Sequence, residues 1–310
     1  MLLSLENATA RKRVGDFAAI DMFVEAGFTG MDYSFFNEPK DWENCFGTPD
    51  VFRKMEKIRR YAEEKGLVLC QSHAPFRFRE GMEMNESEYE YHRVVRSMEL
   101  AAALGIPMIV IHSVMTADNL AMLDFNERYY NSLMPYAERF GIKIAVENLT
   151  GRRNAGDAPT VHNLGTPELF KEMQDRLHSP LIVGCLDIGH ANLTYHDTPS
   201  FIRQCKGYVQ YIHTHDNDGF HDCHLLPALA DYFDACEKPG DGSKKAANPN
   251  SPYTLPWDEV LKALHEIGYD GPFNLELPRY QNCFTTEDLP LALKLAVQVG
   301  RRMMGELGQG

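Results

Sequence analysis

Short apolar runs in this chain repeatedly end in a residue that can bind a metal ion. Each run has the length and β-branched content of a buried strand, and segments with a helical pattern lie between the runs. If the strands are parallel, these end residues emerge at one edge of a single sheet and converge on one site. The runs VLCQSH, MIVIH, IKIAVE, LIVGCLD, YVQYIH and FNLE end at His73, His112, Glu147, Asp187, His213 and Glu276.

The alternation of strand and helix patterns continues from end to end of the 310 residues. It predicts one α/β domain over residues 1–310, a single (β/α)8 TIM barrel. The first helix is expected over Val14–Ala26, and three later helices are expected to begin at Thr-Pro pairs, with Thr as the N-cap. Those pairs begin at Thr48, Thr166 and Thr198, and the strands are expected at Leu2–Leu5, Gly30–Tyr33, Leu67–Ser72, Met108–Ile111, Ile142–Val146, Pro180–Leu186, Tyr208–Ile212 and Pro272–Leu275.

Two loops are expected to shape the top of the barrel. The segment SFFNEPKDWENCFG follows the second strand and carries Phe35, Phe36 and Trp42. These aromatic residues either pack over the barrel or form a wall for the substrate, and Trp42 is a candidate substrate contact. A stretch from about 227 to 256, rich in Gly, Pro, Asn and Ser, is predicted to be a long insertion after the seventh strand.

The charge and cysteine content narrow the class of protein. Lys and Arg number 31 against 44 Asp and Glu, so the net charge is −13 and the average field opposes nucleic acid. No apolar stretch reaches the roughly 18 residues of a membrane span, and the N-terminus lacks the apolar region of a signal peptide. Seven cysteines form no CxxC pair. We therefore expect a reduced, cytoplasmic protein that binds neither nucleic acid nor a membrane.

Glu147, Asp187, His213 and Glu276 end the last four expected strands. Three carboxylates and an imidazole suit one divalent ion of the manganese, cobalt, magnesium or zinc kind. Such an ion polarises a carbonyl and acidifies a neighbouring hydroxyl. Glu147 and Glu276, facing each other across a substrate, are predicted to move a proton between faces of a carbon or between adjacent carbons.

A second ring of side chains surrounds this predicted centre. With a single ion, these side chains bind substrate hydroxyls or order the ligands, and with several ions some of them become ligands. By contrast, His215 and His221 are expected to be exposed loop residues. The predicted substrate-binding residues of this ring are His73, His112, His190, Asp222 and His224.

Four motifs resemble the xylose isomerase-like TIM-barrel superfamily. They are VEN at 146–148, LDIGH at 186–190, IHTHDND at 212–218 and the tail GDG…LPWDEVLKALHEIGYDGPFNLEL at 240–277. This superfamily contains sugar-phosphate isomerases and epimerases, ketose 3-epimerases, inosose isomerases and dehydratases, and endonuclease IV. The resemblance implies a metal site at Glu147, Asp187, His213 and Glu276, catalysis by the two glutamates, and substrate binding by His190.

Two departures separate the chain from the ketose 3-epimerases. Those enzymes carry a further Glu where this chain has Arg153, and they carry a substrate-binding Arg after the ligand His, where this chain reads DNDGF at 216–220. Homo-oligomers are common in the superfamily, and the sequence does not decide the oligomeric state. The sequence predicts a metal-dependent isomerase or epimerase acting on a sugar, sugar acid or cyclitol.

Three other functions stay open. The same proton removal can expel a leaving group, as in a lyase or dehydratase that acts on a keto-sugar, inosose or oxidised glycoside. A carbohydrate-binding barrel without activity would be expected to lack one acidic ligand. An endonuclease IV-like phosphodiesterase would use three zinc ions, and residues of the right type stand at His73, His112, Glu147, Asp187, His190, His213, Asp222, His224 and Glu276.

Overall fold

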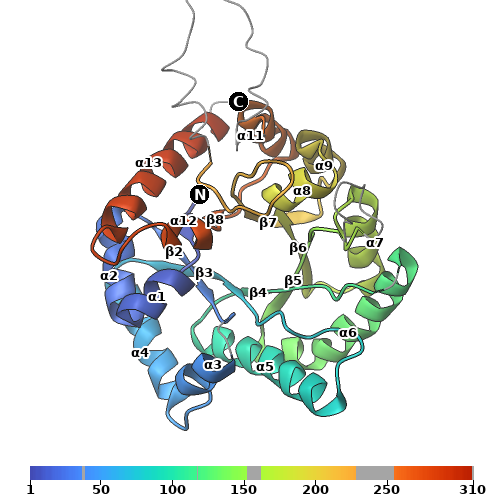
Figure 1. The fold of residues 1–310 in the computed structure, drawn as a ribbon, viewed down its shortest axis with the longest axis horizontal. Helices are drawn as coiled ribbons and strands as arrows, with labels where there is room; N and C mark the ends of the chain where they lie inside the picture. The colour runs from blue at the N-terminus through green and yellow to red at the C-terminus, as the bar shows by residue number, and fades with distance from the viewer. Residues whose placement is uncertain (37–38, 117, 152–161, 228–254, 309–310) are drawn as a thin grey trace, which may run out of the picture.

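A ring of eight parallel strands forms the centre of the described part of the molecule (Figure 1). The computed structural model describes residues 1–36, 39–116, 118–151, 162–227 and 255–308. Most of the predicted insertion at 227–256 lies outside these residues. The strands are β1 Leu3–Leu5, β2 Gly30–Ser34, β3 Val68–His73, β4 Met108–Ile111, β5 Lys143–Glu147, β6 Ile182–Asp187, β7 Val209–His213 and β8 Phe273–Leu275.

Parallel pairing runs around the whole ring. Strands β2 to β7 form one continuous sheet in sequence order, and β1 pairs with β8. Two single bridges close the remaining gaps: Glu6 pairs with Asp32 beside β1 and β2, and Thr214 pairs with Leu275 beside β7 and β8. The predicted TIM barrel is therefore confirmed, and all strand ends of one polarity meet at one mouth.

The longer helices lie outside this ring and cover the outer faces of the strands, whereas the short α8 and α12 lie closer to the strand ends (Figure 1). Within the described residues no helix has the length and apolar content that a membrane crossing requires. The helices are α1 Ala8–Val14, α2 Asp16–Ala26, α3 Pro39–Phe46, α4 Val51–Glu64, α5 Met84–Ala103, α6 Asn119–Phe140, α7 Pro167–Leu177, α8 Ile188–Thr194, α9 Thr198–Gln204, α11 Trp257–Ile267, α12 Pro278–Asn282 and α13 Leu289–Leu307.

Several helix boundaries differ from the prediction. The helix expected at Val14–Ala26 is two helices, because Gly15 adopts φ 82°, outside the helical range, between α1 and α2. Thr166 caps α7 as expected, accepting a hydrogen bond from the Leu169 amide. The prediction is wrong for the other two pairs: the cap of α4 is Asp50, two residues after Thr48, and the cap of α9 is Asp197, one residue before Thr198. The short helices α3, α8 and α12 were not predicted, since each is too short to display a helical period.

Inside the ring, alternate residues of neighbouring strands form a small apolar cluster. It is made of Met108, Val110, Ala145, Val183 and Cys185, all buried. Because successive strand residues face opposite sides, the residue two positions after such an inward side chain also faces inward. Steps of two residues along β5, β6 and β7 therefore end at inward-facing Glu147, Asp187 and His213 at the mouth. The apolar cluster therefore forms a buried floor beneath them.

Candidate metal centre

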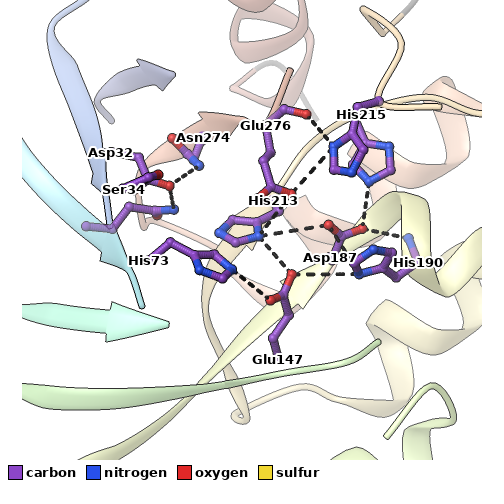
Figure 2. Close-up of polar contacts among 12 residues, drawn as sticks. Asp32, Ser34, His73, Glu147, Asp187, His190, His213, His215, Asn274 and Glu276 are labelled. Atoms are coloured by element: carbon purple, nitrogen blue, oxygen red, sulfur yellow. Dashed lines mark hydrogen bonds and ion pairs between the residues drawn. The ribbon is translucent and has the colours of Figure 1, made fainter. Parts of the chain in front are cut away.

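The four predicted ligands come together at the barrel mouth. Glu147, Asp187 and His213 are the last residues of β5, β6 and β7, and Glu276 directly follows β8. Each of the four offers one ligand atom, and these atoms all lie within 4.8 Å of one another. Figure 2 shows the four side chains pointing toward a common centre. Their spacing is compatible with one shared cation.

His213 lies at the middle of this group. Its Nδ1 atom is 2.9 Å from Glu147 Oε1, 3.5 Å from Glu276 Oε2 and 3.9 Å from Asp187 Oδ2 (Figure 2). All four side chains are buried. Three carboxylates this close and this buried repel one another strongly unless positive charge compensates them. A divalent cation held by these four side chains would supply that charge.

Two further groups of ligand-type side chains adjoin the first. His73 and His112 gather around Glu147: the Nε2 atom of His112 lies 3.0 Å, and that of His73 3.7 Å, from Glu147 Oε2. In each group the ligand atoms lie within 4.8 Å of one another. The second group is His73, His112 and Glu147, and the third is His190, His215, Asp222 and His224.

His215 was predicted to be an exposed loop residue, and that prediction is wrong. Its exposed fraction is 0%, and its Nε2 lies 3.1 Å from Asp187 Oδ1. The chain stays extended past β7 through the Thr214–Leu275 bridge, so His215 faces inward two residues after His213. Gly189 gives it room, because a Cβ there would come within 2.0 Å of the His215 ring. His221 is exposed, as predicted.

Backbone carbonyls fix the orientation of three of these imidazoles. The Nδ1–H of His73 donates to the Ala74 carbonyl at 2.8 Å, that of His190 to Asn148 at 3.1 Å, and that of His224 to Glu276 at 2.8 Å. When such a ring carries a single proton, that proton stays on Nδ1 and the Nε2 lone pair faces the cluster. Histidines that bind metals are held in this way.

Asn148 is a site residue whose role the sequence analysis missed. Its amide nitrogen donates to the Asp187 carbonyl at 2.8 Å, and its side-chain oxygen accepts from the Asp187 amide at 2.7 Å. It therefore ties the end of β5 to the end of β6, and with it Glu147 to Asp187. Its position directly after a ligand-type Glu, in the VEN motif, was the available signal.

Several polar atoms of the three groups lack a hydrogen-bond partner. Four of them lie close to a group of opposite charge, as His215 Nε2 does to Asp187, but without hydrogen-bond geometry. Leaving a buried polar atom unpaired costs about 1–3 kcal/mol, so atoms this numerous and this convergent fit metal ligands. They are Glu147 Oε2, Asp187 Oδ2, His213 Nε2, His215 Nε2 and Asp222 Oδ1.

Burial and charge act against each other on the titration of these groups. Burial alone would raise the pKa of Glu147, but His213 and His112 hold that pKa well below its ordinary value. Burial would likewise lower the pKa of His224, but Asp222 and Glu276 raise it to about 9. Protons on the imidazoles thus balance the carboxylates, and a metal ion would displace those protons on binding.

The other predicted substrate contact, Trp42, lies within the aromatic packing of α3. It is 4% exposed, and its ring packs against Phe46 and beneath the guanidinium of Arg93. Its contact with substrate stays a prediction. Phe36, from the same loop, and Phe76, which follows β3, instead make ring contacts with His73. Phe76 was not predicted, because no motif in the segment after β3 marks it as a ligand contact.

Comparison with known proteins places the chain in a family. An uncharacterized protein of Methanocaldococcus jannaschii is 26% identical over 260 residues, which cover 80% of this chain and 78% of that protein. A D-psicose 3-epimerase solved with D-fructose superimposes with a TM-score of 0.70 at 15% identity, covering 98% of this chain and 100% of the other. The IolI protein, solved with a bound zinc atom, gives 0.69 at 16% identity, with 97% and 99% covered.

The family model described as xylose isomerase-like TIM barrel matches residues 20–303, nearly the whole chain. That match agrees with the closed parallel barrel and with the resemblance of the four sequence motifs. The protein therefore belongs to the xylose isomerase-like TIM-barrel family.

Proposed function

We propose that this protein is a divalent-metal-dependent isomerase or epimerase of a sugar, sugar acid or cyclitol. One observation carries the proposal: Glu147 and Glu276 meet around His213, with ligand atoms within 4.8 Å of one another. A centre with two carboxylates beside a cation site is suited to moving a proton on a carbon next to a carbonyl. The solved D-psicose 3-epimerase and the zinc-bound IolI protein share this barrel, which supports the proposal.

In this proposal Glu147, Asp187, His213 and Glu276 hold one ion of manganese, cobalt, magnesium or zinc. Bound there, the ion polarises the substrate carbonyl and lowers the pKa of the adjacent hydroxyl. Glu147, kept ionised by its lowered pKa, removes a proton from the carbon beside that carbonyl. The electron pair left on the carbon moves onto the carbonyl oxygen.

The second carboxylate decides the outcome. If Glu276 returns a proton to the opposite face of the same carbon, the product is an epimer. If the proton returns instead to the former carbonyl carbon, and the proton of the adjacent hydroxyl passes to the former carbonyl oxygen, the product is an isomer. The surrounding side chains are then proposed to bind the substrate hydroxyls, as donors and acceptors oriented by their backbone contacts. They are His73, His112, His190, Asp222 and His224.

A second function is favoured by a separate observation. All nine residues expected for a three-zinc phosphodiesterase take part in the three groups of ligand-type side chains. The net charge of −13 opposes a DNA substrate. The basic pair Arg152 and Arg153 lies outside the described residues. Hydrolysis of phosphodiesters is therefore the alternative, and elimination from a keto-sugar is a variant of the first proposal.

Metal analysis followed by solvent exchange distinguishes these functions. The purified protein is assayed for bound metals, then incubated in deuterium oxide with ketoses, inososes and 3-keto glycosides, and separately with a duplex containing an abasic site. One ion per chain and deuterium incorporated next to a carbonyl are expected. If the protein bound three zinc ions per chain and nicked the duplex, phosphodiester hydrolysis would replace isomerisation as the favoured function.

A further inference from the structure

Two phenylalanines form a wall on one side of the metal centre, which we call the aromatic wall: Phe36 and Phe76. The ring of Phe76 stacks on His112, with centroids 4.9 Å apart and an interplanar angle of 24°. The ring of Phe36 lies 5.8 Å from that of Phe76 and 5.2 Å from that of His73. Both rings therefore contact histidines that face Glu147.

Phe76 is 49% exposed although it adjoins a buried polar cluster. Exposed phenylalanines on the outer helices have a different setting: Phe17 packs on Tyr61, and Phe52 lies beneath the guanidinium of Arg96. One face of the Phe76 ring is covered by His112, so the remaining area is an apolar surface held in a fixed orientation. A rigid, exposed ring beside a polar site is a typical contact for a ligand.

Phe36 extends the wall toward a neighbouring cavity. It lines a space of about 270 Å³ together with Lys12, Arg13 and Asn282. Arg13 is held there by hydrogen bonds to the Phe284 carbonyl at 2.7 Å and to Asn282 Oδ1 at 3.2 Å. A group attached to a sugar at the metal centre would thus meet an aromatic surface first and a polar cavity beyond it.

The geometry points to an aromatic subsite at Phe36 and Phe76 that binds the ring of an aglycone. The substrate class is then a glycoside with an aromatic or cyclic aglycone, rather than a free monosaccharide. This inference rests on the proposed carbohydrate function. It assigns a separate role to the wall: the metal centre holds the sugar, and Phe76 stacks on the attached ring through its exposed face.

Binding measurements test the subsite without requiring turnover. Isothermal titration of the metal-loaded protein with phenyl β-D-glucopyranoside and methyl β-D-glucopyranoside compares two ligands that differ only in the aglycone. The phenyl glycoside is expected to bind about tenfold more tightly, the scale of one aromatic pair with its buried area. Phe76→Ala and Phe36→Ala should each bring the ratio close to one.

Phe52→Ala is the matched control, since it removes an exposed ring from α4, and it should leave the ratio unchanged. Phe76→Leu keeps apolar bulk without a ring, so it serves if Phe76→Ala does not fold or does not hold metal. Equal binding of the two glycosides to the wild type, or binding of neither, would overturn the subsite. A preserved phenyl preference without deuterium exchange would instead refute the isomerase and leave the subsite standing.

Discussion

Two pairs of buried carboxylates at the barrel mouth behave in opposite ways. Glu147 and Asp187 end β5 and β6, whereas Glu6 and Asp32 lie at β1 and β2 and share a bridge. All four have an exposed fraction of 0%. Asp32 accepts hydrogen bonds from Asn274 and Ser34, and Figure 2 shows it apart from the histidines that surround Glu147. Position at the mouth is therefore not what distinguishes the pairs.

The difference lies in what each carboxylate faces. Burial by itself favours a higher pKa for each of the four carboxylates. At Asp187 the charges of His190 and His215 outweigh burial, so the pKa of Asp187 is lowered. At Glu6, burial together with the nearby charges of Asp32 and Glu276 raises the pKa to about 8. At Asp32, burial outweighs the more distant charges of His213 and His73 and the hydrogen bond from Gln71, so its pKa is raised. Imidazole neighbours, more than burial, mark the carboxylates that are ready to bind a cation.

The largest expected effect separates the two pairs by activity. Glu147→Gln and Glu276→Gln should each lower substrate proton exchange by at least about 10²–10⁴-fold, the contribution of a positioned acid or base. Asp32→Asn should stay within about tenfold of the wild type, because its amide can pair with the same side chains. Solvent-deuterium incorporation measures all three rates. A nearly normal rate in Glu147→Gln would rule out the two-carboxylate mechanism.

The next effect concerns metal affinity within the imidazole-rich side of the site. His213→Asn removes a nitrogen at the centre of the first group and should weaken manganese binding by about 100-fold or more. His224→Asn alters the third group, so its effect should stay within the roughly 10–100-fold range of an outer contact. Titration with manganese, followed by metal analysis, gives affinity and stoichiometry. If the wild type bound more than one ion per chain and His224→Asn bound one ion fewer, the single-ion proposal would be contradicted.

The sequence predicted the part of the site that depends on regular geometry. Parallel strands with a period of two place every strand-end residue on the same side, so Glu147, Asp187 and His213 could be grouped from their spacing alone. Glu276 followed from the same count on the last strand. The closed barrel was predictable for the same reason, since the alternation of elements leaves few other arrangements.

The sequence did not predict features that depend on contacts between distant segments. His215 is buried only because the chain stays extended past β7 and Gly189 leaves space opposite it. The role of Asn148 arises from a pairing across 39 residues with Asp187. Phe76 contacts His112 from an irregular loop, and the path of such a loop cannot be predicted from sequence periodicity. Tertiary contacts decided each of these, and local patterns contain no signal for them.

The smallest expected effect returns to Glu6 and concerns stability. Because the pKa of Glu6 is raised from 4.5 to about 8 in the folded protein, the folded state binds more protons than the unfolded state between these values. The free energy of unfolding therefore falls as pH rises from about 4.5 to 8. Glu6→Gln removes this cost, keeps an acceptor for the Ala8 amide, and should raise that free energy by about 4 kcal/mol at pH 8. At pH 5 the gain should fall to about 1 kcal/mol or less.

Urea denaturation of the metal-free protein at the two pH values measures this difference. Asp21→Asn is the control, because hydrogen bonds from Lys65 and Tyr61 lower the pKa of that half-buried carboxylate, so its ionisation is complete over the same range. It should change stability equally at pH 5 and pH 8. If Glu6→Gln behaved like Asp21→Asn, Glu6 would be ionised in the folded state. The claim that a buried carboxylate without imidazole neighbours has a raised pKa would then be wrong for Glu6.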